Sequence, residues 1–228
     1  RATHHEGVWT GSMSLRTSPA NRTGYLSSIG LCVVSVAYVV VVAFGVLEAG
    51  FDDPIADPTL AVMETLTLLA ALLLVAVMSA IQETASRDRK IFGVMALVFA
   101  GVMAGLTSAV HFVALTAGRQ TDFTVLEWPS TLYAIELLAW DVFLGLSLVC
   151  AALVFVGSGI RALARWSLLV TGALSLLGAM GPIVGDMAIQ RIGVLGYGVG
   201  LPITALVLSR FFLRDGDSSG RSRSNGTS

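Results

Sequence analysis

Charged residues are scarce in this chain of 228 residues. Asp, Glu, Lys and Arg make up 13% of it, whereas 55% of its residues are hydrophobic. Soluble domains carry about 25% charged residues, so the composition excludes an ordinary soluble protein. Apolar runs of about 20 residues, the length of a helix that crosses a bilayer, recur along the chain. We therefore predict an integral membrane protein whose partner is the lipid bilayer, and we expect no nucleic-acid partner.

Cysteine and histidine are also rare, and their positions argue against the common metal sites. Cys32 and Cys150 are the only cysteines, and both lie inside apolar runs without the paired C-x-x-C spacing of structural zinc. Only one histidine, His111, lies in an apolar run, so paired axial ligands for haem are lacking. The sequence also has no phosphate-binding loop, Rossmann fingerprint or HExxH motif. We expect no bound cofactor and no metal.

Six apolar stretches predict six membrane-spanning helices in an all-α bundle that covers residues 25–213. Their approximate ranges are 26–47, 59–81, 91–117, 129–156, 166–185 and 192–213. Asp57 is placed to cap the second helix, with Pro58 in its first turn. The polar ends, residues 1–24 and 214–228, lack apolar periodicity and predict disordered tails. Residues 1–12 precede Met13, a plausible start, and are a candidate upstream extension.

Small residues predict where these helices approach closely. Gly101-x-x-x-Gly105 in the third helix and Gly196-x-x-x-Gly200 in the sixth have the spacing of close helix packing. Pro202, just after the second pair, predicts a kink because proline interrupts the helical hydrogen-bond ladder.

The basic residues favour one orientation of the helices. All but two of the 14 Lys and Arg residues lie in the two terminal regions or in the connections after the second and fourth helices. The exceptions, Arg119 and Arg191, lie in connections on the opposite side. Since cytoplasmic loops carry an excess of Lys and Arg, both termini are predicted to be cytoplasmic.

Ionisable residues within or beside the predicted helices gather on the opposite, outer side. A carboxylate at the centre of a membrane helix costs roughly 3 kcal/mol on insertion scales, so it needs a partner or a wet cavity. At about 1.5 Å per residue, Glu136 lies roughly 10 Å and Asp141 roughly 17 Å below the outer end of the fourth helix. The candidate pocket, ion or proton residues are Glu64, His111, Glu136, Asp141, Asp186 and Arg191.

Helical geometry predicts which of these residues can meet. Asp141 follows Glu136 by five positions, about 140° around the helix. The two acids should therefore face different neighbours and form no carboxylate dyad. His111, on the third helix, lies at a depth similar to that of Glu136, so we expect these two to meet across the bundle. Asp186 and Arg191 are candidates for a salt bridge at the rim, where such pairs stabilise little.

Three functional hypotheses fit this pattern. In the first, the acids are structural and hold helices together through hydrogen bonds that contribute about 0.6 kcal/mol each. In the second, the carboxylates and His111 relay protons or hold a cation, as in transport of a small solute or ion. In the third, an outward-facing membrane enzyme uses His111 with Glu136 or Asp141 as acid, base or metal ligand. We favour an outward-facing polar pocket in a transporter-like or structural protein and keep the enzyme as the alternative.

Three strings, HFVALTAGR, WPSTLYAIELLAWDVFLGLSL and GPIVGDMAIQRIGVLGYG, resemble prokaryotic multipass membrane proteins of unknown function. The similarity covers roughly residues 91–212. It implies a six-helix protein of the prokaryotic cytoplasmic membrane, and it implies no activity and no functional residue.

Overall fold

The computed structural model describes residues 18–50, 55–120 and 128–224, with side chains through residue 215. All the regular structure in these residues is helical. The α-helices are α1 (Pro19–Ala49), α2 (Thr59–Thr84), α3 (Lys90–Leu115), α4 (Thr131–Leu137), α5 (Leu144–Val154), α6 (Ile160–Gly178), α7 (Met180–Val184), α8 (Met187–Leu195) and α9 (Leu201–Ser224). Two 3₁₀ turns, η1 (Arg87–Arg89) and η2 (Ala117–Arg119), flank α3, and the segments η3 (Leu138–Phe143) and η4 (Gly196–Gly200) are π-helical.

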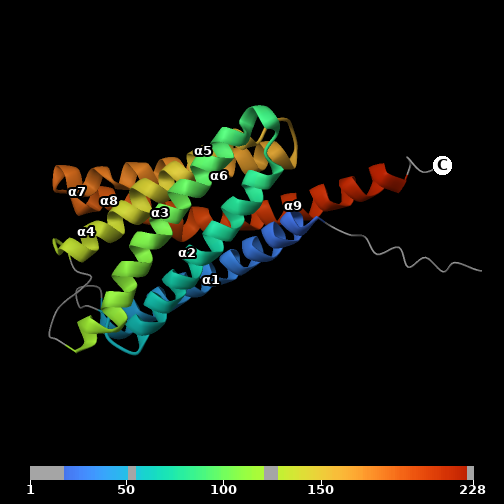
Figure 1. Ribbon diagram of the computed structural model, residues 1–228. Helices are drawn as coiled ribbons and strands as arrows, with labels where there is room; N and C mark the ends of the chain where they lie inside the picture. The colour runs from blue at the N-terminus through green and yellow to red at the C-terminus, as the bar shows by residue number, and fades with distance from the viewer. Residues whose placement is uncertain (1–17, 51–54, 121–127, 225–228) are drawn as a thin grey trace, which may run out of the picture.

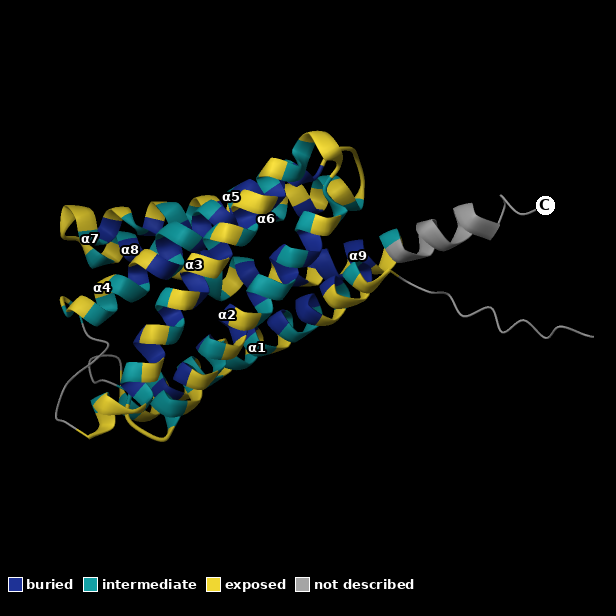
Figure 2. Ribbon diagram, viewed as in Figure 1, coloured by how far each residue is buried: buried dark blue, intermediate teal, exposed yellow. Residues whose placement is uncertain are grey.

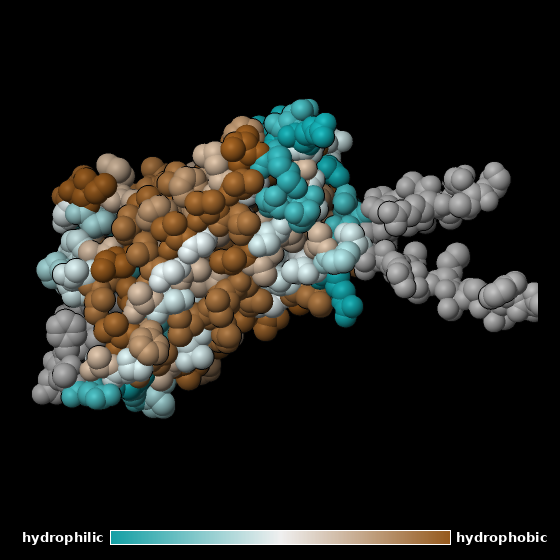
Figure 3. Space-filling view, viewed as in Figure 1, coloured by the Kyte–Doolittle hydropathy of each residue, from teal (hydrophilic) through white to brown (hydrophobic). Residues whose placement is uncertain are grey.

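These elements join into six stretches that are long and apolar enough to cross a membrane. They are Pro19–Ala49, Thr59–Thr84, Arg87–Arg119, Thr131–Val154, Ile160–Val184 and Met187–Asp215. The predicted all-α bundle of six membrane helices is thereby confirmed. Hydrophobic residues cover the middle of the bundle between more hydrophilic ends, as Figure 3 shows. Such a surface is suited to contact with the apolar interior of a lipid bilayer.

The helices run back and forth between two ends of the bundle (Figure 1). The terminal end holds the start of α1, the last part of α9 and the connections at residues 85–89 and 155–159. The far end holds the connections that follow α1, α3 and α7. A hollow of about 500 Å³ at the terminal end is lined by Ser18 at the start of α1, Glu83 at the end of α2 and Asp215 of α9, among others. Both ends of the described chain therefore lie on one side, as an even number of spans requires.

The first helix begins earlier than its apolar run, so the predicted disordered tail through residue 24 is wrong at its end. The hydroxyl of Ser18 accepts a hydrogen bond from the Asn21 N–H at 3.2 Å, and Pro19 occupies the first turn. Gly24 lies against Phe212 of α9 so closely that a Cβ would come within 2.6 Å of the ring. The polar first turns of α1 are thus capped and packed into the bundle. Residues 1–17, with the rest of that predicted tail, lie outside the described residues.

Two other boundaries also differ from the sequence prediction. The fifth span begins at Ile160 instead of near residue 166, because helix formation resumes directly after Gly157 and Gly159, whose φ angles are 110° and 64°. The last helix continues to Ser224, well into the range predicted as a disordered tail. Residues 225–228 lie outside the described residues.

The fourth span is the most enclosed of the six. In its most apolar window 61% of the residues are buried, compared with 17% in the first span. Dark-blue buried positions accordingly concentrate on the faces where helices meet (Figure 2). Ser147 of α5 donates a hydrogen bond to the carbonyl of Ala96 on α3 at 2.8 Å, and Gly145 packs against the Gly172 backbone of α6. Ser147 on the fourth span therefore faces a neighbouring helix.

Of the two glycine pairs predicted to allow close helix packing, only Gly196 and Gly200 lie against another helix of the bundle. A Cβ at Gly196 would lie 3.0 Å from Leu174, and one at Gly200 would lie 2.7 Å from the Thr171 hydroxyl. At Gly101 and Gly105, by contrast, nothing lies within 4 Å of the Cβ position. Their face of α3 points away from the other helices, so the prediction of close packing is wrong for this pair within the chain. The last span is interrupted by η4 immediately before Pro202, where the sequence predicts a kink.

Candidate functional site

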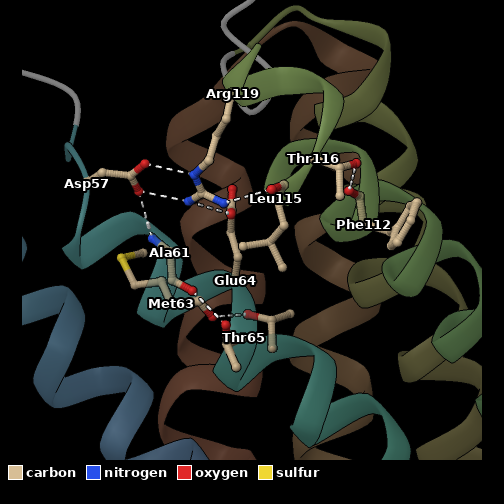
Figure 4. A network of polar contacts seen from close by, with 10 residues as sticks. Asp57, Ala61, Met63, Glu64, Thr65, Phe112, Leu115, Thr116 and Arg119 are labelled. Carbon is tan, nitrogen blue, oxygen red and sulfur yellow. Dashed lines mark hydrogen bonds and ion pairs between the residues drawn. The ribbon is translucent and has the colours of Figure 1, made fainter.

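An ionic network connects the second and third spans at the far end of the bundle (Figure 4). Arg119 donates from Nε and Nη2 to the two carboxylate oxygens of Asp57, both at 2.8 Å, and Nη2 also lies 3.4 Å from Oε2 of Glu64. A further Arg119 nitrogen donates to the carbonyl of Leu115 at 3.2 Å. Asp57 also accepts the N–H of Ala61 in the first turn of α2 at 3.2 Å. The N-cap position itself is held by Pro58, so the prediction of Asp57 as the cap and Pro58 as the first helical residue is wrong by one position. The Arg119 hydrogen bond is the main cause that lowers the pKa of Asp57 below its ordinary value.

Burial increases sharply across this network. The side chain of Asp57 is 50% exposed and that of Arg119 is 31% exposed, but that of Glu64 is only 4% exposed. The guanidinium therefore lies between a carboxylate at the surface and one inside the bundle. Arg119 and Asp57 were not among the predicted site residues. The sequence signal that could have identified Arg119 is its isolation, since Arg119 and Arg191 are the two basic residues that lie away from the termini and from the connections after the second and fourth helices.

The predicted meeting of His111 and Glu136 is confirmed. Nε2 of His111 on α3 lies 2.9 Å from Oε1 of Glu136 on α4, and both side chains are largely buried. Thr107, one turn earlier on α3, directs its hydroxyl to the other Glu136 oxygen at 3.4 Å. The remaining ring nitrogen of His111, Nδ1, is buried without a hydrogen-bond partner. Glu64 also interacts electrostatically with His111, which links this pair to the Arg119 network.

Asp141 lies apart from this pair, on the π-helical segment η3. Its side chain is fully buried. Oδ2 lies 3.5 Å from Nε2 of Gln190 on α8, and the same nitrogen donates to the Tyr197 hydroxyl at 2.9 Å. Oδ1 has no hydrogen-bond partner and faces Gly178 and Gly193. The two acids of the fourth span thus face different helices and form no dyad, as predicted.

The π-helical segments bring the surroundings of Asp141 together. Trp140, next to Asp141 on η3, packs against Tyr197 of η4 with ring centroids 5.6 Å apart. A π-helical turn holds an extra residue compared with an α-helical turn, and such turns are frequent at functional sites. Gln190 and Tyr197, seven residues apart and therefore on one face of the last span, are the site residues that sequence reasoning missed. Nothing in the local sequence predicts the wider turns.

The two remaining candidates, Asp186 and Arg191, do not join the cluster. Asp186 is exposed and caps α8, because its Oδ1 accepts the Ala188 N–H at 2.9 Å. Within the residues that the structure describes, Asp186 and Arg191 form no salt bridge, so that prediction is wrong. Five positions along a helix place the two side chains on different faces.

The far half of the bundle therefore contains ionisable side chains at increasing depth. They are Asp57, Arg119, Glu64, His111, Glu136 and Asp141. We call this set the polar cluster. Carboxylates and imidazole bind and release protons and can hold cations. Within the described ranges no group of three or more His, Cys, Asp or Glu side chains is placed to hold a metal ion.

Comparison with protein-family models, with curated proteins and with solved structures finds no match to this chain. The function must therefore be inferred from the geometry of the polar cluster.

Proposed function

We propose that this chain is a transporter-like protein of the prokaryotic cytoplasmic membrane, with both termini in the cytoplasm and the polar cluster open to the outside. The cluster binds a proton or a small cation. The orientation is supported by the basic residues, most of which belong to the terminal end. The resemblance to prokaryotic multipass proteins supports the choice of membrane.

The observation that carries this proposal is the incomplete pairing of Asp141. Two of the hydrogen bonds that join helices in this bundle are short: Ser147 to the Ala96 carbonyl at 2.8 Å and Thr171 to Thr204 at 2.9 Å. Asp141 is buried equally deeply, yet it has one long contact and one oxygen without a partner. A buried carboxyl that is incompletely satisfied costs free energy. Such a residue is better explained by ion binding than by helix association.

The rest of the polar cluster supplies a route toward Asp141. Glu64 lies beneath Arg119, and the His111–Glu136 pair follows on the adjoining helices. Tyr133, one turn before Glu136, interacts electrostatically with both Glu136 and Asp141. A proton entering at the far end would therefore meet acids and bases at each depth on its way to Asp141.

The decisive experiment measures ion flux in proteoliposomes. A potassium diffusion potential drives uptake, a trapped pH dye reports protons, and isotopic sodium reports cation entry. Asp141→Asn should lower the flux at least about ten-fold relative to the wild type. The control, Asp88→Asn, changes an exposed carboxylate at the terminal end and should leave the flux unchanged. Equal flux through wild type and Asp141→Asn would refute transport through this residue and favour the structural hypothesis.

The alternative is an outward-facing membrane enzyme. It is favoured by the 2.9 Å contact between His111 and Glu136, because a carboxylate that orients an imidazole is a common acid–base arrangement. Such an enzyme would keep its activity in Asp141→Asn and lose it in His111→Gln. A transporter that uses the whole polar cluster would lose flux in both variants.

A further inference from the structure

Two glycines form the niche that receives the free oxygen of Asp141. Gly178 near the end of α6 and Gly193 on α8 are packed so closely that a Cβ on Gly178 would lie 2.6 Å from Cα of Gly193. The same Cβ would lie 3.0 Å from Oδ1 of Asp141, and a Cβ on Gly193 would come closer still. A larger residue at position 193 would collide with the carboxyl group, and one at position 178 would collide with the Gly193 backbone while crowding the same oxygen. The niche therefore exists only because both positions lack a side chain.

This niche is too small and too poor in ligands for a metal ion. Mg²⁺ and Ca²⁺ in proteins bind roughly six or more oxygen ligands at about 2.0–2.6 Å. Even a single Cβ on either glycine would come within 3.0 Å of Oδ1 of Asp141, which leaves no room beside this oxygen for an ion and its ligand shell. Within the described residues Asp141 belongs to no group of three or more His, Cys, Asp or Glu side chains that could hold a metal ion.

A proton fits this niche, because it adds almost no volume and needs no shell of oxygen ligands. Its binding also removes the negative charge of the buried carboxylate. No Lys, Arg or His side chain of the described residues is paired with Asp141 by a salt bridge or hydrogen bond. Tyr133 of α4 and Tyr197 of η4 interact electrostatically with Asp141. Along its own span the nearest titratable residue is Glu136 of α4. On the other elements that pack against η3 or contact Asp141, the titratable residues are His111 and Lys90 of α3, Cys150 of α5, Arg161 and Arg165 of α6 and the exposed Arg191 of α8. His111 is bonded to Glu136 and Arg161 to Asp215, so neither neutralises Asp141.

We propose that the Asp141 niche is a proton-specific binding site, and that Gly178 and Gly193 determine this specificity by excluding larger cations. The inference rests on the proposed transport function and names its ion. In the binding step the Asp141 carboxylate forms one O–H bond with a proton delivered from the Glu136 side. In the release step the same bond breaks and the same proton leaves, so no other group is consumed.

Infrared spectroscopy of the reconstituted protein tests the site separately from transport. A protonated buried carboxyl gives a C=O stretching band, and this band should titrate with pH and be absent in Asp141→Asn. Titrations in sodium, potassium and choline chloride at equal ionic strength should coincide. If sodium displaced the proton and shifted the titration relative to choline, the niche would be a cation site and the inference would be overturned. If Asp141→Asn left the spectrum unchanged at every pH, proton binding at Asp141 would be refuted.

The glycines are tested by a matched pair of substitutions. Gly193→Ala places a methyl group against Oδ1 and should shift and broaden the Asp141 band while lowering proton flux at least about ten-fold. Gly101→Ala, at a position with nothing within 4 Å, should change neither measurement. If Gly193→Ala does not fold, Gly178→Ala replaces it, and the spectrum of Asp141→Asn still tests the site. An unaltered band and flux in a folded Gly193→Ala protein would overturn the role of the niche.

These outcomes separate the two proposals. A titrating Asp141 band without any proton or sodium flux would reject the transporter and leave the proton site standing. Flux that requires Asp141 but carries sodium as readily as protons would keep the transporter and reject proton specificity.

Discussion

Arg119 and Asp57 are 62 positions apart in the sequence, yet two nitrogens of Arg119 donate to the two carboxylate oxygens of Asp57 at 2.8 Å each. This bidentate pair joins Arg119, at the end of the third span, to Asp57, which lies two residues before the second span. Exposed ion pairs contribute little to stability, so its importance lies in where it holds the guanidinium. Arg119 is kept above Glu64, the first buried carboxylate of the polar cluster.

The Arg119–Asp57 pair should give a pH-dependent contribution to stability. Because hydrogen bonding to Arg119 lowers the pKa of Asp57 below 3.8 in the folded protein, the contribution is complete above that value. It is lost as the pH falls from 3.8 through the lower folded value. In detergent, Asp57→Asn should therefore melt slightly below the wild type at neutral pH, and the difference should vanish in strong acid. Asp88→Asn, which alters an exposed acid outside the network, should show no such convergence, and a pH-independent difference for Asp57→Asn would contradict the assignment.

The contact between α5 and α6 should be intolerant of side-chain volume at Gly172. A Cβ there would lie 2.9 Å from the carbonyl oxygen of Gly145 and 3.1 Å from Leu148. Overpacking of this kind typically costs about 1–3 kcal/mol. Gly172→Val should therefore lower the melting temperature in detergent clearly, whereas Gly101→Val, on an open face of α3, should leave it nearly unchanged. Similar melting temperatures of the two variants would show that the α5–α6 contact tolerates a larger side chain at position 172.

The sequence predicts those features that depend on length, periodicity and depth. The six spans follow from apolar runs, and the contact between His111 and Glu136 follows from their similar depth on neighbouring helices. The separate surroundings of Glu136 and Asp141 follow from their spacing around the helix. Periodicity gives no information about the long-range pairing of Arg119 with Asp57, because each lies in a connection whose path depends on the packed helices.

The sequence also does not predict the irregular turns of the backbone. The π-helical turns η3 and η4 place Asp141, Trp140 and Tyr197 together, but they result from tertiary packing and have no fixed sequence signature. Glycine spacing was equally ambiguous. Gly196 and Gly200 pack against α6, while Gly101 and Gly105 have the same spacing and meet nothing. A glycine pair indicates that close approach is allowed, and only the arrangement of the helices decides whether it occurs.

Access to the polar cluster from outside the cell should be measurable by cysteine labelling. In a protein whose Cys32 and Cys150 are replaced by alanine, Glu64→Cys should react with a membrane-impermeant maleimide added to intact cells. Adding Arg119→Ala should speed the reaction, because the guanidinium no longer covers position 64. Ser147→Cys, buried deep between α5 and α3, should stay unlabelled. Labelling of Glu64→Cys only after the cells are permeabilised would refute the outward-facing cluster.

The orientation of the bundle should be visible from reporters on its two ends. A fluorescent protein fused after residue 228 should fold in the cytoplasm, because the basic residues of the terminal end are retained on that side. Alkaline phosphatase inserted into the connection between Gln120 and Trp128 should be active, since that enzyme needs the extracytoplasmic space. Exchanging the two reporters is the matched control and should abolish both signals. Active phosphatase at the C-terminus would reverse the orientation, and the polar cluster would then open to the cytoplasm, where transport would have to begin from inside.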